Sequence, residues 1–299
     1  MRRRNYKSIQ IMTMVITMGL LAGCAELSDD KIEENVNKQV EKVNNSISKT
    51  VQNATIDWMD ETKQNGLNNK LSLKQEIGSA TSVLLHNEVG NIEVKTTSDD
   101  QMTVSTTIWV NKERASEKDL HAILDNAETE VIADGDQLKI VTHPKDHPKH
   151  NMWDWAQDKY GYSEMSIDYV VEIPAGITSY EITSNVGSLQ LSNLEGKYDV
   201  HNDVGSILIE GARIVGESRI QSSTGSVQLG IDRMDSDSRL EAATEVGSII
   251  AKLADSLACD LETVTELGQV TGADLGESKR NGGGPLLKLR TSIGSITVE

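Results

Sequence analysis

Apolar and polar positions along the chain recur as one short phrase: polar, apolar, Gly, usually Ser, apolar, variable, apolar. Copies of the phrase are centred on Gly187, Gly205, Gly225, Gly247, Gly268 and Gly294, and a further copy lies upstream at Gly90. The six downstream glycines are 18, 20, 22, 21 and 26 residues apart. Repetition at such a period is typical of folds built from stacked units.

Each copy predicts a sharp corner between two short strands. Glycine adopts a positive φ at little cost, which suits a corner. Apolar residues alternate with variable ones after the glycine, as in Leu189 and Leu191, and also before it, as in Tyr180 and Ile182. One such unit cannot bury its apolar side alone, whereas stacked units bury a continuous column.

The pattern therefore predicts a mainly β fold, a single-stranded β-solenoid with coils of about 20 residues. An antiparallel sandwich with tight glycine turns is the alternative. The residues that follow the glycines are expected to stack as a hydroxyl column that breaks at Gln269; these are Ser188, Ser206, Ser226, Ser248 and Ser295.

The N-terminal segment has the pattern of an export signal. A basic stretch, Met1–Gln10, precedes the apolar run Ile11–Leu21, which is short for a membrane span. The run ends in Leu-Ala-Gly-Cys24, which resembles the bacterial lipobox. This resemblance implies cleavage before Cys24 and a lipid anchor on Cys24, with the mature chain on the extracytoplasmic side of the cell membrane. Two acyl chains on one residue anchor a protein stably. An uncleaved apolar anchor is the alternative and gives the same topology.

A helical pattern follows the lipobox. Apolar residues from Ile32 to Trp58 are spaced by 4, 4, 3, 4, 4, 3 and 4 positions, which predicts an amphipathic helix. The helix either packs on the β part or lies near the membrane surface; a self-associating stalk is the alternative. The polar stretch Lys63–Asn69 is predicted to be a linker. The expected organisation is a signal peptide (1–23), a lipidated stalk and linker (24–69) and a β domain (70–299).

An insertion of about residues 111–163 separates the phrase at Gly90 from the regular copies. Ser116 is the expected N-cap of a helix whose apolar face carries Leu120, Ile123 and Leu124. Asp134-Gly135-Asp136 predicts a hairpin turn. Met165–Gly176 predicts a long strand that leads into the repeats.

The end of this insertion concentrates histidine and aromatic residues. The residues in question are His143, His147, His150, Trp153, Trp155, Tyr160 and Tyr162. Pro144 and Pro148 predict irregular structure there. The stretch is a candidate ligand-binding loop, either an aromatic platform for a carbohydrate or a metal site formed by converging imidazoles. The alternative is an exposed loop that folds its aromatic rings onto the side of the β domain. No metal ligands are assigned.

Composition narrows the range of partners. The chain carries 46 acidic and 29 basic residues, a net charge of −17. Without Arg2, Arg3, Arg4 and Lys7 the balance is 46 acids against 25 bases, or −21. Such a charge repels phosphate backbones, so we expect no nucleic-acid partner. If Cys24 carries lipid, Cys259 has no partner within the chain and is predicted to be a small buried hydrophobe.

The strand Tyr169–Gly176, with its Ile-Pro-Ala-Gly ending, followed by tandem Val-Gly-Ser phrases, resembles the bacterial putative-adhesin domain family of unknown function. The likeness covers roughly residues 82–299 and implies a β-solenoid on an envelope protein, with no catalytic motif to carry over. Carboxylates such as Glu195, Asp203 and Glu245 stand at differing offsets from the glycines, which argues against a catalytic groove.

We therefore expect a non-catalytic, cofactor-free adhesive or structural module of the cell envelope, which binds the membrane through Cys24 and a cell-wall polymer or envelope protein. A regulatory envelope-stress protein with a membrane partner is the alternative, and a polysaccharide-active β-helix enzyme is a remote one.

Overall fold

The computed structural model describes residues 63–113 and 115–299. These residues confirm a mainly β fold, with twenty strands joined in one extensive sheet and two helices with their own capping residues. Cys24 and the predicted helix over 32–58 lie outside the described residues. No helix within the described part of the chain is long and apolar enough to cross a membrane.

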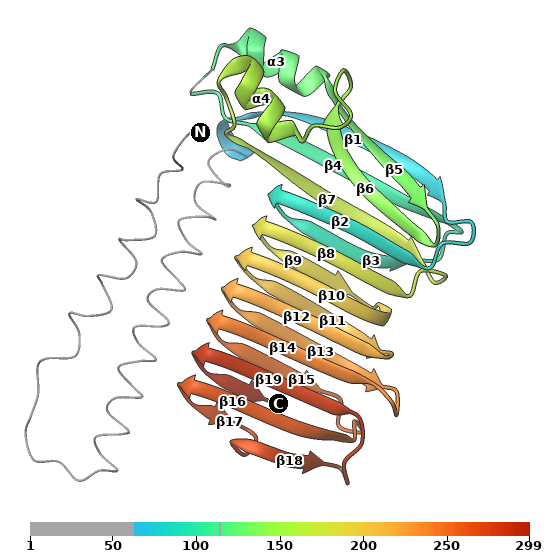
Figure 1. Ribbon diagram of the computed structural model, residues 1–299, viewed down its shortest axis with the longest axis vertical. Coiled ribbons are helices and arrows are strands. Elements are labelled where there is room, and N and C mark those ends of the chain that lie inside the picture. The colour runs from blue at the N-terminus through green and yellow to red at the C-terminus, as the bar shows by residue number, and fades with distance from the viewer. Residues whose placement is uncertain (1–62, 114) are drawn as a thin grey trace, which may run out of the picture. The chain divides into compact units, whose positions relative to one another are not determined.

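Seven repeat units make up most of the fold, and each contains one strand before its glycine and one after it (Figure 1). The strand pairs are β2 (Ser82–Val89) and β3 (Ile92–Thr97), β8 (Ser179–Val186) and β9 (Leu189–Ser192), β10 (Glu195–Val204) and β11 (Ile207–Ile214), β12 (Glu217–Thr224) and β13 (Val227–Met234), β14 (Arg239–Val246) and β15 (Ile249–Leu253), β16 (Cys259–Leu267) and β17 (Val270–Thr271), and β19 (Leu286–Ile293) and β20 (Ile296–Val298).

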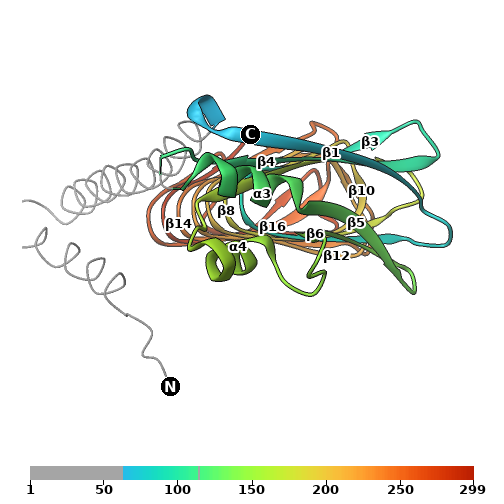
Figure 2. The same cartoon turned by 90° about the horizontal axis from the view of Figure 1, so that it is seen from above.

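Strands from successive units pair in parallel and form two ladders. We call them the pre-glycine ladder, which includes β8, β10, β12 and β14, and the post-glycine ladder, which includes β9, β11, β13 and β15. The register keeps equivalent positions side by side, so that Val200 of β10 lies between Ile182 and Ile220. The two ladders face each other in the view from above (Figure 2).

The spatial order of the units departs from the chain order at the C-terminal side. β19 pairs with β14 on one edge and with β16 on the other, and β20 likewise lies between β15 and β17. The last unit of the sequence is therefore inserted between two units that precede it. This insertion keeps the hydroxyl column continuous, because Ser248 and Ser295 are neighbours with their Oγ atoms 3.1 Å apart. Gln269 stands at the end of the column, not at a break within it.

The core lies between the two ladders and follows from the alternation in sequence. Residues two positions after the glycines are fully buried in six units: Ile92, Leu189, Ile207, Val227, Ile249 and Ile296. Large side chains from the pre-glycine strands meet them, among them Tyr180 and Tyr198, whose ring centroids are 5.4 Å apart. The hydroxyl of Tyr198 donates to the carbonyl of Leu194 at 2.6 Å, so its polar end is satisfied inside the core.

The corner glycines have φ between 131° and 158°, a range that side chains disfavour. Neighbouring units also approach closely at these corners. A Cβ atom on Gly225 would lie 1.7 Å from the carbonyl oxygen of Gly205, and one on Gly187 would lie 2.0 Å from that of Gly90. Glycine is thus required for two independent reasons, the backbone conformation and the contact with the next unit.

A second polar column runs inside the fold, three positions before each glycine. Its members are Asn87, Ser184, Asn202, Ser222, Thr244, Thr265 and Thr291. Several donate to a corner carbonyl of the adjacent unit: Asn202 to Gly187 at 2.8 Å, and Thr244 to Gly225 at 3.1 Å. These bonds occupy carbonyls that would otherwise be buried without a side-chain partner.

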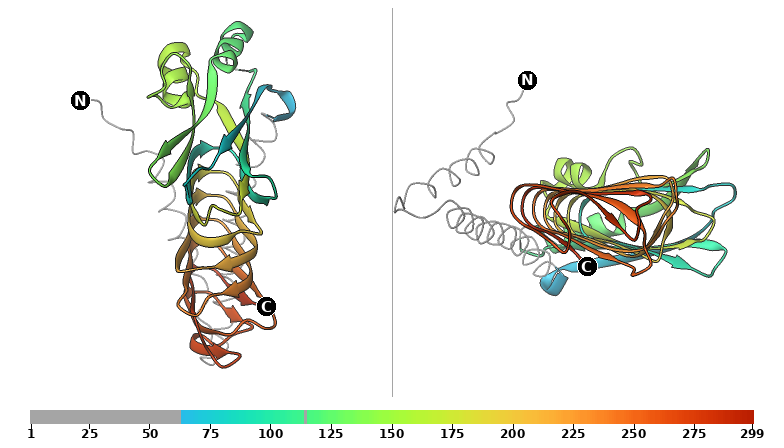
Figure 3. Two further views of the ribbon diagram at one scale, coloured as in Figure 1. Left: turned by 90° about the vertical axis from the view of Figure 1, so that its right-hand side faces the viewer. Right: turned by 90° about the horizontal axis from the view of Figure 1, so that it is seen from below.

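One end of the stack carries the insertion, and we call it the helical end (Figure 3, left). It contains β1 (Leu67–Glu76), β4 (Gln101–Val110), α3 (Glu117–Asp125), β5 (Ala127–Asp134), β6 (Gln137–Pro144), α4 (Met152–Tyr160) and β7 (Met165–Pro174). The predicted Ser116 cap, the hairpin around Gly135 and the long strand from Met165 are confirmed.

Two expectations at the helical end were wrong. Residues 67–69 are not linker but the start of β1, because Leu67 pairs with Val110 and begins an alternating stripe with Leu71. The stretch after Pro148 is not irregular but forms α4. Asn151 caps this helix by accepting from the amide of Asp154 at 2.7 Å, so the prolines precede the helix and do not interrupt it.

The opposite end, which we call the far end, is formed by β16, β17 and β18 (Gly276–Arg280). β18 pairs antiparallel with β16 on the edge away from β19. β17 has only two residues and pairs with β20 on one edge. The far end therefore closes with short, partly polar strands.

Candidate binding surface

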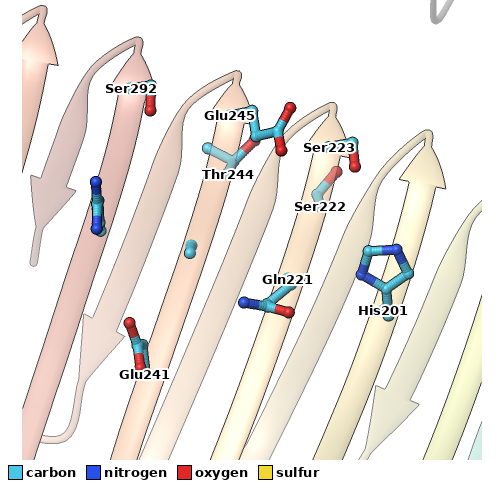
Figure 4. A pocket seen from close by; sticks show the side chains of 10 residues that line it. His201, Gln221, Ser222, Ser223, Glu241, Thr244, Glu245 and Ser292 are labelled. Carbon is cyan, nitrogen blue, oxygen red and sulfur yellow. The ribbon is translucent and has the colours of Figure 1, made fainter.

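A hollow of about 300 Å³ lies on the outer face of the pre-glycine ladder, across β10, β12, β14 and β19. Figure 4 shows the side chains of His201, Gln221, Glu241 and Glu245 on adjacent strands of this face. Because the strands are in register, each side chain keeps a fixed place relative to those on the neighbouring strands.

A second hollow of about 320 Å³ adjoins the first and shares Glu241 with it. It is lined by Asp199, Glu217, Arg219 and Arg239 among others. We call the two hollows together the outer groove.

Charges of opposite sign alternate across the strands of the outer groove. Asp199 lies beside Arg219, Arg219 beside Glu241, and Glu241 beside Lys288. The row continues to Glu262, whose Oε1 atom is 2.7 Å from Nζ of Lys288. Opposite charges on directly paired residues stabilise a sheet modestly and leave a surface rich in both donors and acceptors.

One histidine–carboxylate pair borders the groove near the corners, and a second lies two strands further along the pre-glycine ladder. Nε2 of His201 lies 2.8 Å from Oδ1 of Asp203, and Nε2 of His86 lies 3.5 Å from Oε1 of Glu88. Thr183 stands between the two histidines in the ladder and lies 2.7 Å from Nδ1 of His86. Within the described residues, no group of three or more His, Cys, Asp or Glu side chains is placed to hold a metal ion.

The predicted ligand loop does not gather its side chains on one surface. Trp155 and Tyr162 are buried, with 3% of each exposed. Trp153 is half-buried and donates from Nε1 to the carbonyl of Met165 at 3.0 Å. Tyr160 packs edge-on against Trp155, and Lys159 lies over both rings. These rings fill the helical end and do not form a common exposed platform.

The three histidines of the same stretch also separate. His143 is buried in β6, with Nε2 3.0 Å from Oε1 of Glu130. His147 and His150 are exposed, and their ring centroids are 5.6 Å apart. The arrangement therefore places one imidazole inside the fold and two outside it.

Two buried titratable side chains, Tyr162 and Cys259, belong to the hydrophobic core. The hydroxyl of Tyr162 donates to the carbonyl of Asn111 at 3.0 Å, and burial raises the pKa of this tyrosine to about 12. Cys259 is fully buried, and burial raises the pKa of its thiol. A raised pKa lowers the thiolate fraction at neutral pH, so this thiol is a poor nucleophile.

The row of charges that crosses the outer groove is not evident when the carboxylates are considered without the basic residues. When both signs of charge are counted, Asp199, Arg219, Glu241, Lys288 and Glu262 all stand six positions before a corner glycine. This constant offset was the available signal for the groove. The interior polar column, three positions before each glycine, could have been found in the same way.

No family model and no curated protein matches the chain. Among solved structures, it is similar to a putative cell adhesion protein from Clostridium sporogenes (TM-score 0.42, 10% identity, 78% of this chain and 99% of that one). It is also similar to a putative adhesin from Bacteroides fragilis (TM-score 0.33, 12% identity, 77% and 97%) and to a putative lipid binding protein from Parabacteroides distasonis (TM-score 0.34, 13% identity, 79% and 98%). Likeness at this level assigns no function, so the proposals below rest on the chain itself.

Proposed function

We propose that the chain is a membrane-tethered, non-catalytic binding module of the cell envelope, built on a β-solenoid. The solenoid interpretation is supported by seven units with equivalent registers and by corner glycines that contact one another from unit to unit. The tether interpretation is supported by the lipobox-like sequence that ends at Cys24. Binding is assigned to the outer groove.

The observation that carries the binding assignment is the alternating row of charges across the groove. Donors such as Arg219 and Arg290 and acceptors such as Glu241 and Glu245 are presented by adjacent strands at the spacing of a sheet, about 4.8 Å. A rigid row of this kind suits an extended polar polymer, which can repeat the same contacts from strand to strand. We therefore propose a cell-wall polysaccharide as the ligand class.

Binding of the full-length protein to purified cell-wall polysaccharide tests this assignment. Arg219→Gln and Glu241→Gln remove one charge each from the groove and are expected to weaken binding at least about fivefold, since each removes a charge-assisted hydrogen bond. Lys252→Gln is the matched control, because Lys252 is exposed on the post-glycine ladder. Equal binding by all four proteins would contradict a site in the groove. Capture of one envelope protein in place of the polymer would favour the regulatory alternative.

The tether is tested separately. Cys24→Ser should move the protein from the membrane fraction to the soluble fraction, because the acyl chains that would hold it are lost. Mass spectrometry of the wild-type N-terminal peptide should show the acyl groups. Unchanged fractionation together with an unmodified Cys24 would refute the anchor and leave the groove assignment standing.

A further inference from the structure

The far end exposes apolar side chains that the rest of the stack covers. Within the described residues, four large hydrophobic residues are markedly exposed, and two of them, Leu267 (47%) and Leu275 (67%), lie here. Val270 stands at the position that is fully buried in the six other units, yet it is only partly buried. The terminal unit thus has the side chains of an internal unit without a neighbour to cover them.

The backbone at this end also lacks the neighbour that other units have. The amide of Gly225 donates to the carbonyl of Val246 in the next unit at 2.9 Å, and the amide of Gly294 donates to Leu267. Gly268 belongs to the last unit of the described stack, so no following unit supplies that acceptor. An edge with free backbone groups and exposed apolar residues is a template for adding another strand.

β18 is the outermost strand beside β16 at the far end, and its sequence indicates which strand could pair with it. β18 reads Gly-Glu-Ser-Lys-Arg, and its outer edge is not paired among the described residues. If two copies of β18 pair antiparallel about Ser278, Glu277 of each copy lies directly opposite Lys279 of the other. Both side chains are exposed and share one face of the strand, so the two pairs are oppositely charged. Within one copy Glu277 lies beside Glu262, a like charge, whereas Lys279 lies beside Asp260, with Nζ 3.9 Å from Oδ1.

We propose that the far end is a self-association surface, through which two copies of this chain pair end to end about a two-fold axis at Ser278. A two-fold interface must be self-complementary, and the charges of β18 satisfy that requirement. Leu275 directly precedes β18 in the chain, so this exposed apolar side chain lies next to the proposed interface. Any competing strand from another protein would have to match the same order of charges.

The proposed surface lies at the end of the stack opposite to the one at which the described chain begins. The described chain begins at Lys63, whose Nζ atom lies 2.8 Å from Asp168 of β7 at the helical end. The segment that leads to Cys24 therefore joins the stack at the end opposite to β18. On the basis of the proposed tether, copies anchored in two facing membranes would meet through their far ends, which makes the adhesion homophilic.

Charge exchange tests the pairing itself. Full-length Glu277→Lys and full-length Lys279→Glu each place like charges opposite one another twice, and each is expected to weaken self-association at least about tenfold in sedimentation velocity. An equimolar mixture of the two variants restores both oppositely charged pairs and should associate as the wild type does. The double variant E277K/K279E should do the same.

Several results would overturn the proposal. Wild-type protein that stays monomeric up to about 0.1 mM would exclude a specific interface of this kind. Association that the single variants leave unchanged would place the contact elsewhere, and a mixture that fails to associate would refute the antiparallel pairing about Ser278. Thermal unfolding of each variant checks that the exposed substitutions leave the fold intact.

Vesicles separate this proposal from the tether. Two populations of vesicles that carry the wild-type protein should cluster, as should a mixture of Glu277→Lys vesicles with Lys279→Glu vesicles, whereas either variant alone should not. Clustering that is lost on Cys24→Ser, while association in solution persists, supports both proposals. Association in solution without clustering of protein-loaded vesicles would retain the interface and refute its role between membranes.

Discussion

The repeat units at Gly225 and Gly268 carry the same phrase and nearly the same glycine conformation, with φ of 152° and 158°. Their surroundings differ, because the first is enclosed by units on both sides and the second has a unit on one side only. As a result Val227 is fully buried, whereas the equivalent Val270 is partly exposed. The burial of a repeat position is therefore set by the neighbouring unit as much as by its own residue.

The largest expected effect comes from breaking the corner in the middle of the stack. Gly225→Val places a side chain against the carbonyl of Gly205 and is expected to lose about 4 kcal/mol or more of stability. Gly268→Val meets the carbonyl of Gly294 in the same way but can release the short β17, so about 1–3 kcal/mol is expected. Denaturant unfolding measures both.

Gly216→Ala is the matched control for these two variants. Gly216 has a φ of 71°, but a methyl group added there would have no described residue within 4 Å, so only the backbone cost of about 1–2 kcal/mol remains. Equal losses for Gly225→Val and Gly216→Ala would mean that contact between units contributes nothing at the corner.

Truncation of equivalent core residues should give the next largest difference. Ile249→Ala removes a fully buried side chain between two units and is expected to cost about 2–5 kcal/mol. Val270→Ala, at the same position of the terminal unit, is expected to cost under about 1 kcal/mol, since less area is buried there. Similar losses at the two sites would show that the far end is covered in solution.

The interior polar column gives a smaller and more selective contrast. Thr244→Val removes the donor to the carbonyl of Gly225 and should cost about 1–3 kcal/mol. Ser222→Ala should change stability by less than about 0.5 kcal/mol, because the buried Ser222 hydroxyl has no hydrogen-bond partner among the residues that the structure describes. A larger loss for Ser222→Ala than for Thr244→Val would reverse the roles assigned to these two side chains.

The smallest effect concerns reactivity and not stability. Cys259 lies in β16, close to the far end, yet it is fully buried and its pKa is raised. Because the thiolate is the reactive form, a maleimide should label Cys259 slowly in the native protein even at mildly alkaline pH, and rapidly in denaturant. Rapid native labelling would indicate that the terminal unit opens readily.

Much of the scaffold could be predicted because each glycine phrase encodes its own corner and its own alternation. Ser116 and Gly135 are likewise local signals, and the structure places a helix and a hairpin turn where they predict them. The structure of α4 was missed because Asn151, a good N-cap, outweighs the two prolines that precede it. Pro144 and Pro148 both lie before the N-cap, so neither removes a hydrogen bond from the helix or distorts it.

The order of the units and the groove could not be predicted in the same way. Nothing local in Leu286–Val298 states that this segment lies between β14–β15 and β16–β17; the preference depends on contacts between distant residues. The alternating charges of the groove are encoded at a constant offset from the corner glycines, but the side-by-side order of Glu241, Lys288 and Glu262 depends on the insertion of β19 between β14 and β16. The cluster of aromatic residues near Trp155 suggested a binding surface. Its burial depends on tertiary packing and could not be predicted from the local sequence.

The insertion of β19 and β20 between earlier units has a consequence for the order in which the chain can fold. β16 is synthesised before β19. The strand that lies between β16 and β14 is β19, which comes later in the sequence. The amide of Glu299 adds a hydrogen bond to the carbonyl of Ala251 at 2.8 Å, just beyond β20. A chain cut before Leu286 would keep β16–β18 but lose the strands that pair with them on one side and with β14 and β15 on the other. The native pairing of the far end with the rest of the stack therefore requires the last residues of the sequence to be synthesised first.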